Sequence, residues 1–258
     1  MARLRHVLAM PFPAQGHVTP LLKLAHLIAE HGVKVTFINS IVIQDKLMSA
    51  RPELFEDQSQ LRFVALPDGM DSDEDRKDAN TWVERYAAAV SPRLQELIKK
   101  INDPDGDDEK IDCVIGDVTA GWALEVAVSL GIAAVGFWPA GASCLLLQLH
   151  IPKLIKEGVI DEDGIPLRNT TIKISDKIPA WSSDGLTWSN IGDPTQQRAL
   201  FGFVKSIIEY AKHTNIFLCN SFIELEPSAI EIIPGILPVG IPAPPPSLTE
   251  EEEEKKTR

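Results

Sequence analysis

The sequence lacks the short motifs that mark several large classes of α/β enzyme. Its 258 residues contain neither a GxGxxG fingerprint nor a P-loop, so no dinucleotide-binding or nucleoside-triphosphate-binding loop is indicated. No GxSxG pentapeptide is present, which excludes the nucleophile elbow of the α/β hydrolases. The six histidines form no HExxH or similar pair, so we expect no metal site and no metal cofactor.

Positive charge, cysteine and long apolar runs are also scarce. The net charge of −12 argues against nucleic-acid binding, which needs a basic surface. Cys113, Cys144 and Cys219 lie far apart in apolar segments, which predicts buried, reduced thiols in a reducing compartment. No stretch reaches the ~18 apolar residues of a membrane span, and the first residues do not resemble a signal peptide. We therefore expect a cytoplasmic protein without a membrane span.

Short apolar segments alternate along the chain with longer segments of helical period. The composition, 44% hydrophobic with a mean hydropathy of −0.01, is that of an ordinary globular protein. Residues 160–193 are polar and irregular. The apolar segments predict strands at 6–12, 33–39, 61–67, 111–117, 132–138 and 215–221, and the helical periods predict helices at 18–31, 41–50, 81–101, 121–131, 140–157 and 195–213.

The expected strands are apolar throughout, which is typical of a parallel sheet covered on both faces. Alternation of strand and helix indicates right-handed βαβ units. We therefore predict an α/β fold, a single Rossmann-like doubly wound parallel sheet, over residues 1–240. Residues 241–258 are rich in proline and carry a run of glutamates, so we expect a disordered tail there.

One histidine and one aspartate are candidates for catalysis. His17, in the stretch "PFPAQGHVTP", follows the first expected strand, and Asp117 ends the fourth. In the common strand order 3-2-1-4-5 these strands are neighbours, so both side chains lie at the same sheet edge, where ligands bind. A neutral imidazole held by a carboxylate can act as a general base. Alternatively, His17 is a surface residue at a helix end and Asp117 is an N-cap.

The sequence resembles the N-terminal part of the plant family 1 UDP-glycosyltransferases. The resemblance rests on "HVLAMPFPAQGHVTPLLKLAHLIAEHGVKVTFINS", "LPDGM", "VIGDVTAGWALEVAVSLGIAAVGFWPAGA" and "FLCNSFIELEP", which match in order and spacing. It implies the N-terminal, acceptor-binding domain of a GT-B fold. It also implies transfer of a hexose, glucose above all, from a UDP-sugar to a hydroxyl or carboxyl of a small secondary metabolite, with inversion. His17 would be the general base and Asp117 its partner.

The resemblance also assigns residues to the two substrates. The acceptor would be lined by parts of the expected helix 81–90 and by Phe12, Pro13, Gln15, Gly16, Phe137 and Trp138. Gly16 and Thr19 would contact the donor. Each of these residues has an alternative interpretation as ordinary core or loop packing. Pro139 stands where many family members carry a threonine or serine, so we expect no sugar contact there.

The family's donor-binding box, a long stretch that contains "HCGWNS", is missing from the sequence. We therefore expect the C-terminal domain to be absent and the chain to have little activity alone. Its partners would be a small-molecule acceptor, and a UDP-sugar only if a C-terminal domain is supplied. Two alternatives remain: a non-catalytic acceptor-binding module, and a truncated product that folds poorly.

Overall fold

The computed structural model describes residues 5–55, 60–70, 72, 82–105, 110–167, 171–188 and 193–240. The expected tail, residues 241–258, lies outside this range, as does most of the acidic stretch between residues 71 and 81. Among the helices in the described ranges, none is both long and apolar enough to cross a membrane.

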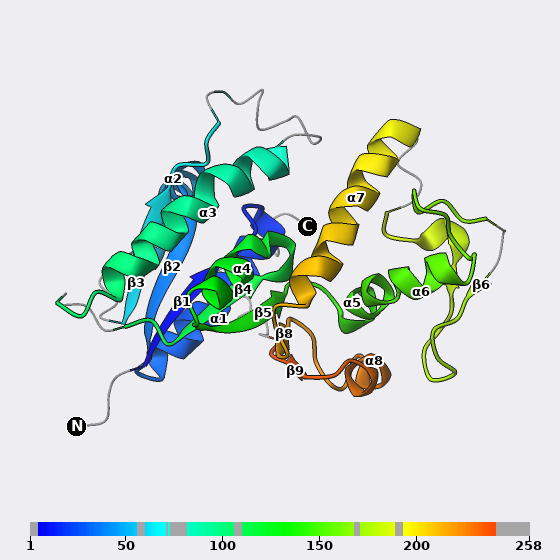
Figure 1. Cartoon of the computed structure of the whole chain (residues 1–258). Helices are drawn as coiled ribbons and strands as arrows, with labels where there is room; N and C mark the ends of the chain where they lie inside the picture. The colour runs from blue at the N-terminus through cyan, green and yellow to red at the C-terminus, as the bar shows by residue number, and fades with distance from the viewer. Residues whose placement is uncertain are drawn as a thin grey trace, which may run out of the picture.

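Seven parallel strands form the central sheet, in the order β3-β2-β1-β4-β5-β8-β9 (Figure 1). The predicted order 3-2-1-4-5 is therefore correct, and β1 and β4 are neighbours, with Met10 opposite Gly116. The strands are β1 (His6–Met10), β2 (Lys34–Ser40), β3 (Leu61–Leu66), β4 (Cys113–Asp117), β5 (Ala133–Trp138), β8 (Phe217–Cys219) and β9 (Ile236–Pro238).

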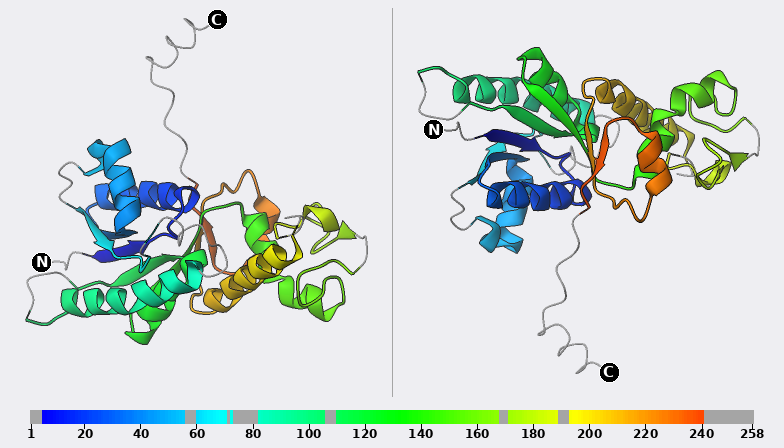
Figure 2. Two further views of the ribbon diagram at one scale, coloured as in Figure 1. Left: turned by 90° about the horizontal axis from the view of Figure 1, so that it is seen from above. Right: turned by 90° about the horizontal axis from the view of Figure 1, so that it is seen from below.

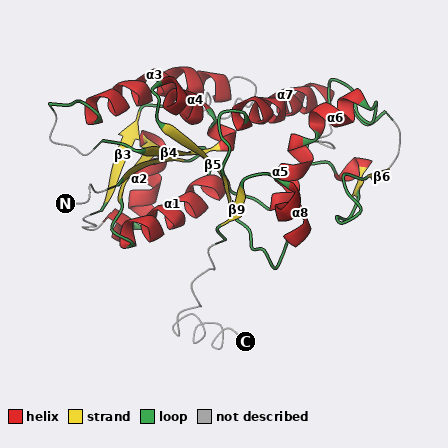
Figure 3. Cartoon of the chain, turned by 60° about the horizontal axis from the view of Figure 1, so that its bottom comes forward, coloured by secondary structure: helices red, strands yellow, loops and turns green. Residues whose placement is uncertain are grey.

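Helices cover both faces of the sheet, as the apolar strands predict (Figure 2). Successive side chains of a strand point to opposite faces, so Leu8 packs under α3 (Trp82–Ile101) and α4 (Trp122–Ser129). Its neighbour Ala9 packs under α1 (Gln15–Glu30). Figure 3 shows these two layers edge-on, with α2 (Ile41–Ala50) beside α1.

A second cluster of elements lies beyond the end of the sheet that β8 and β9 form. It contains α5 (Ala142–Leu149), α6 (Ile151–Lys156), the hairpin of β6 (Thr171–Ile172) and β7 (Trp181–Ser182), α7 (Pro194–Ala211) and α8 (Pro227–Ile232). Trp188 and Phe201 lie at the centre of its core, with ring centroids 5.4 Å apart. The segment 140–157, predicted as one helix, contains two helices, α5 and α6, which meet at His150.

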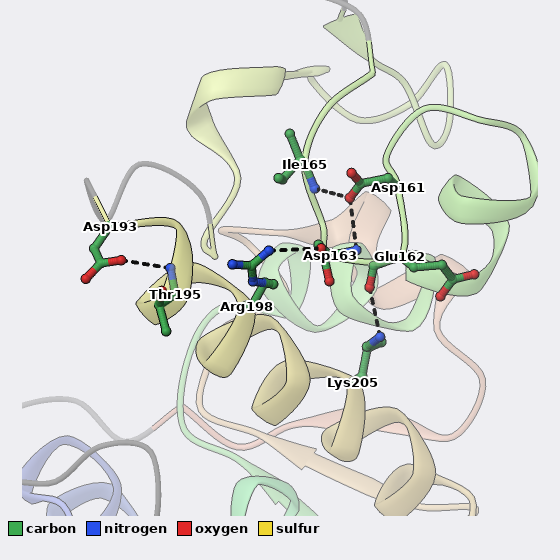
Figure 4. A network of polar contacts seen from close by, with 8 residues as sticks. All are labelled: Asp161, Glu162, Asp163, Ile165, Asp193, Thr195, Arg198 and Lys205. Atoms are coloured by element: carbon green, nitrogen blue, oxygen red, sulfur yellow. Dashed lines mark hydrogen bonds and ion pairs between the residues drawn. The ribbon is translucent and has the colours of Figure 1, made fainter.

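The loop after α6 is fastened to α7 by polar contacts (Figure 4). The side chain of Asp161 accepts two backbone N–H groups of its own loop, which holds the turn. Lys205 of α7 donates to a backbone carbonyl of this loop, and Arg198 lies 3.8 Å from Asp163. Each exposed ion pair contributes little stability. Together with the aromatic core, these contacts fix the position of α7 relative to the loop.

Element boundaries differ from the predictions mainly at short segments. Helix α1 begins at Gln15, three residues before the predicted start, and β6, β7, β9 and α8 were not predicted. Strand β9 contains Pro238, which cannot donate to a ladder and is therefore tolerated at the sheet edge that β9 forms. Short edge elements of this kind give too few residues for a periodic signal.

Candidate active site

The carboxyl ends of β1 and β4 bring His17 and Asp117 together. Asp117 is the last residue of β4 and is fully buried, and its Oδ2 lies 2.8 Å from Nδ1 of His17. Its second oxygen, Oδ1, accepts the backbone N–H of Thr119 at 2.8 Å and so caps the short helix η3 (Val118–Ala120). The N-cap interpretation of Asp117 is therefore confirmed, and the other oxygen makes the contact that a catalytic pair would need. The catalytic role itself stays a prediction.

The first turn of α1 presents His17 to this carboxylate. The helix starts after Ala14, whose carbonyl accepts the backbone N–H of His17 at 2.9 Å. A carboxylate can only accept, so the proton between the two groups belongs to Nδ1 of the neutral ring. The other nitrogen, Nε2, then carries a lone pair and has no hydrogen-bond partner among the described residues. The side chain is 26% exposed, so part of the imidazole faces solvent.

The imidazole contacts the ring of Phe12, and three further aromatic rings pack around Phe12. The ring of Phe12 lies 5.0 Å from that of His17, centroid to centroid. Phe12 in turn lies 5.2 Å from Trp82 of α3 and 5.7 Å from Phe203 of α7. Trp122 of α4 completes the group at 6.5 Å from Phe12. We call Phe12, Trp82, Trp122 and Phe203 the aromatic wall; it meets the His17 ring through Phe12.

A small cavity of about 150 Å³ opens beside the aromatic wall, where β2 and β3 end. Burial, and next the nearby Asp68 carboxylate, raise the pKa of the Tyr86 phenol there, so Tyr86 stays protonated at neutral pH. Asp68 is itself buried. The cavity is lined by Pro13, Ser40, Val42, Ile43, Lys46, Asp68, Trp82 and Tyr86.

The residues predicted for the substrates lie in three different places. Phe12 belongs to the aromatic wall and Pro13 lines the small cavity, and their contact with an acceptor stays a prediction. Gln15 and Thr19 line a separate, larger cavity between α1 and α2. Gly16 is exposed, and a Cβ added there would meet no atom within 4 Å. No packing contact in this chain therefore demands a glycine at position 16.

Phe137 and Trp138 lie inside the protein. Phe137 is 1% exposed and packs in the core under α1, and Trp138 is 4% exposed in the core around α5. The indole N–H of Trp138 donates to the carbonyl of Gly141 at 2.9 Å, which holds the loop that contains Pro139. In this structure the two rings are packing residues, the alternative that the sequence left open. A contact with the acceptor remains a prediction.

Sequence reasoning did not single out Phe203 or Trp122. Both residues belong to helices that approach β1 through tertiary packing. Helix α7 reaches the site because its Tyr210 packs against Gly121, which has no side chain in the way. A Cβ at residue 121 would lie 2.0 Å from Cγ of Tyr210. The only local signal was the aromatic content of "ALFGF". Across the described part of the chain, no group of three or more His, Cys, Asp or Glu side chains is placed to hold a metal ion.

Comparison with known proteins is consistent with this geometry. The family model described as "Glycosyltransferase, N-terminal domain" matches residues 5–65. UDP-glycosyltransferase 83A1 of Arabidopsis thaliana is 34% identical over 239 residues, which cover 91% of this chain and 52% of that protein. The chain is homologous to the N-terminal half of the plant UDP-glycosyltransferases. A 7-deoxyloganetin glucosyltransferase of Gardenia jasminoides is 29% identical, and the match covers 90% of this chain and 50% of that protein.

Solved glycosyltransferase structures share the fold. A UDP-glucosyltransferase from Polygonum tinctorium, described as capable of glucosylating indoxyl, matches with a TM-score of 0.74 at 22% identity over 98% of this chain and 56% of its own. Phytolacca americana UGT2, complexed with UDP-2fluoro-glucose and pterostilbene, gives a TM-score of 0.71 at 17% identity, over 99% and 58%. The predicted fold, the N-terminal Rossmann-like domain of GT-B glycosyltransferases, is thereby confirmed. The chain spans about half the length of the glycosyltransferases that it matches.

Proposed function

We propose that this chain supplies the acceptor site and the general base of a UDP-sugar-dependent glycosyltransferase of plant secondary metabolism. The observation that carries the proposal is the 2.8 Å contact between Nδ1 of His17 and the buried carboxylate of Asp117. It leaves Nε2 as a lone-pair acceptor on a partly exposed side chain next to the aromatic wall. A hexose, glucose above all, is the proposed group that is transferred.

The proposed step moves one proton and one glycosyl group. Nε2 of His17 takes the proton from an acceptor hydroxyl while the oxygen attacks the anomeric carbon of the sugar. The bond between that carbon and the β-phosphate oxygen breaks, and UDP leaves with the electron pair, so the configuration inverts. The Asp117 carboxylate stabilises the imidazolium that forms. The step needs no cofactor, because the proton goes to His17 and the electron pair goes to UDP.

A flat, apolar acceptor fits the surroundings of the base. Trp82 and Phe203 of the aromatic wall are partly exposed, and an aromatic acceptor packed against them gains area burial and ring contacts. Pro13 and Tyr86 add to this side through the small cavity. On the donor side we propose Gly16, where no side chain blocks a close approach, and Thr19.

The test compares acceptors with and without a proton to remove. The full chain is incubated with UDP-glucose and either benzyl alcohol or benzoate, and the product is measured by mass spectrometry. A second arm adds the half of the Arabidopsis relative that this chain does not cover, because the sequence holds no donor-binding box and we propose that one is needed. His17→Ala should lower transfer to benzyl alcohol by ~10²–10⁴-fold. Transfer to benzoate, which is already ionised, should fall far less.

His31→Ala is the matched control, because His31 is exposed at the end of α1, away from the base. It should leave both reactions unchanged. Equal losses for the two acceptors would refute the base role of His17. A different result would contradict sugar transfer: the chain melts cooperatively and an acceptor quenches its tryptophan fluorescence, but neither arm forms product. That result would indicate a non-catalytic binding module.

A further inference from the structure

A second cavity lies along the other side of α1, between that helix, α2 and the short helix η1 (Pro52–Phe55). Its volume is about 390 Å³, within the range of small-molecule sites. Figure 2 shows α1 and α2 side by side on one face of the sheet. The proposed reaction uses neither the interior of this cavity nor its lining beyond Gln15 and Thr19.

The lining combines an apolar floor with cationic groups. Leu22 of α1 and Leu47 of α2 are among the aliphatic side chains that form the floor. Lys23 and Lys46 stand on the two facing helices, and neither has an ion-pair partner among the described residues. None of the described residues that line the cavity is acidic, although the chain carries a net charge of −12. The positive charge is therefore a local feature of this cavity.

Arg51, at the end of α2, adds a third cation that is already paired. Its Nε donates to the carboxylate of Glu53, and both side chains are exposed. An exposed pair of this kind is weak, so it can open without a large loss. The unpaired lysines are therefore the stronger attraction for an anion.

The imidazole of His26 is a further part of the lining. Its Nε2 atom is buried, and no described residue gives it a hydrogen-bond partner. With almost no accessible surface, this atom cannot reach a ligand in the cavity, so His26 contributes other atoms of its ring to the lining. His26 lies on the same face of α1 as Leu22 and Lys23 and lines the cavity with them. The His26 ring is therefore a reporter of ligand binding in this cavity.

We propose that this cavity binds a small amphiphilic anion, a carboxylate on an aliphatic or aryl body. The body lies on the leucine floor, and the carboxylate meets Lys23 and Lys46. The ligand need not take part in sugar transfer. The proposal is therefore independent of the proposed function.

Binding is tested on the full chain with three probes of equal chain length: octanoate, octan-1-ol and octylammonium. Calorimetry should give an affinity for octanoate about tenfold or more above that for octan-1-ol, and no saturable binding of octylammonium. Octanoate should shift the ring nitrogen resonances of His26, whereas octan-1-ol should not. UDP, added as a competitor, should leave octanoate binding unchanged.

Two variants and one control locate the site. Ala50→Trp, at an exposed cavity position, should block the cavity and weaken octanoate binding by at least about tenfold. Lys23→Gln should weaken it by about three- to fivefold. Lys100→Gln, an exposed lysine of α3 outside the cavity, should change nothing. Equal affinity for octan-1-ol, an unshifted His26, full binding by Ala50→Trp or displacement by UDP would each overturn the proposal.

Discussion

Replacing Asp117 with asparagine should reverse the tautomer of His17, and the structure dictates the direction. Oδ1 of Asp117 accepts the N–H of Thr119, so in Asp117→Asn the amide oxygen must occupy that position. The amide NH₂ group then takes the place of Oδ2, 2.8 Å from Nδ1 of His17. Because NH₂ can only donate, Nδ1 must accept and the ring proton moves to Nε2. The nitrogen that should receive the acceptor proton is then already protonated.

The expected loss of turnover on a hydroxyl acceptor is nearly that of removing the base, roughly 10²–10⁴-fold. The fold should survive, because the cap of η3 is kept and the side-chain volume is unchanged. Asp117→Ala would instead leave the buried Thr119 N–H unpaired, at a cost of about 1–3 kcal/mol in the free energy of unfolding. Comparison of the two variants separates the tautomer effect from a loss of stability.

Nitrogen NMR of the imidazole reads the tautomer without any turnover. The native protein should show a protonated Nδ1 at His17, Asp117→Asn a protonated Nε2, and Asp45→Asn, an exposed control on α2, the native pattern. A native ring protonated at Nε2 would refute the argument for His17 as a base. The same holds for an unchanged tautomer in Asp117→Asn.

Three further predictions follow from the packing around the site. Burial raises the pKa of the Glu226 carboxyl, but the hydrogen bonds from Ser221, Ser143 and Ala142 lower it more, so the net shift is downward. Its stabilisation should therefore be present above about pH 4.5, the usual range for a glutamate, and be lost as the pH falls through the lower folded-state value. Acid titration of the unfolding free energy should show this loss in the native chain and not in Glu226→Gln. Gly121→Ala should lower the unfolding free energy by about 1–3 kcal/mol, because its Cβ collides with Tyr210. Gly202→Ala, at an open position of α7, should be neutral or stabilising; equal melting temperatures for the two variants would contradict this. Burial raises the pKa of Cys113 to about 11 and of Cys219 to about 12, so iodoacetamide at pH 8 should label both far more slowly in the folded chain than in urea. Equal labelling rates in the two states would be inconsistent with that burial.

The order of the sheet and the meeting of His17 with Asp117 could be predicted from the sequence. Both depend on local patterns: apolar strands that alternate with helices fix a parallel doubly wound sheet, and chain position fixes which strand ends are neighbours. The buried thiols were only partly predicted. Cys219 is buried, but Cys113 and Cys144 are partly exposed at the surface of the elements that carry them.

The surroundings of the base were decided by tertiary packing alone. Phe203 reaches Phe12 across 191 residues of sequence only because α7 crosses the turn at Gly121. The same packing buries Phe137 and Trp138, and it turns Gln15 and Thr19 towards α2. Local sequence sets the period and the ends of each element. The way the helices cross the sheet then decides which side chains share a site. That crossing depends on contacts between residues that are far apart in the sequence.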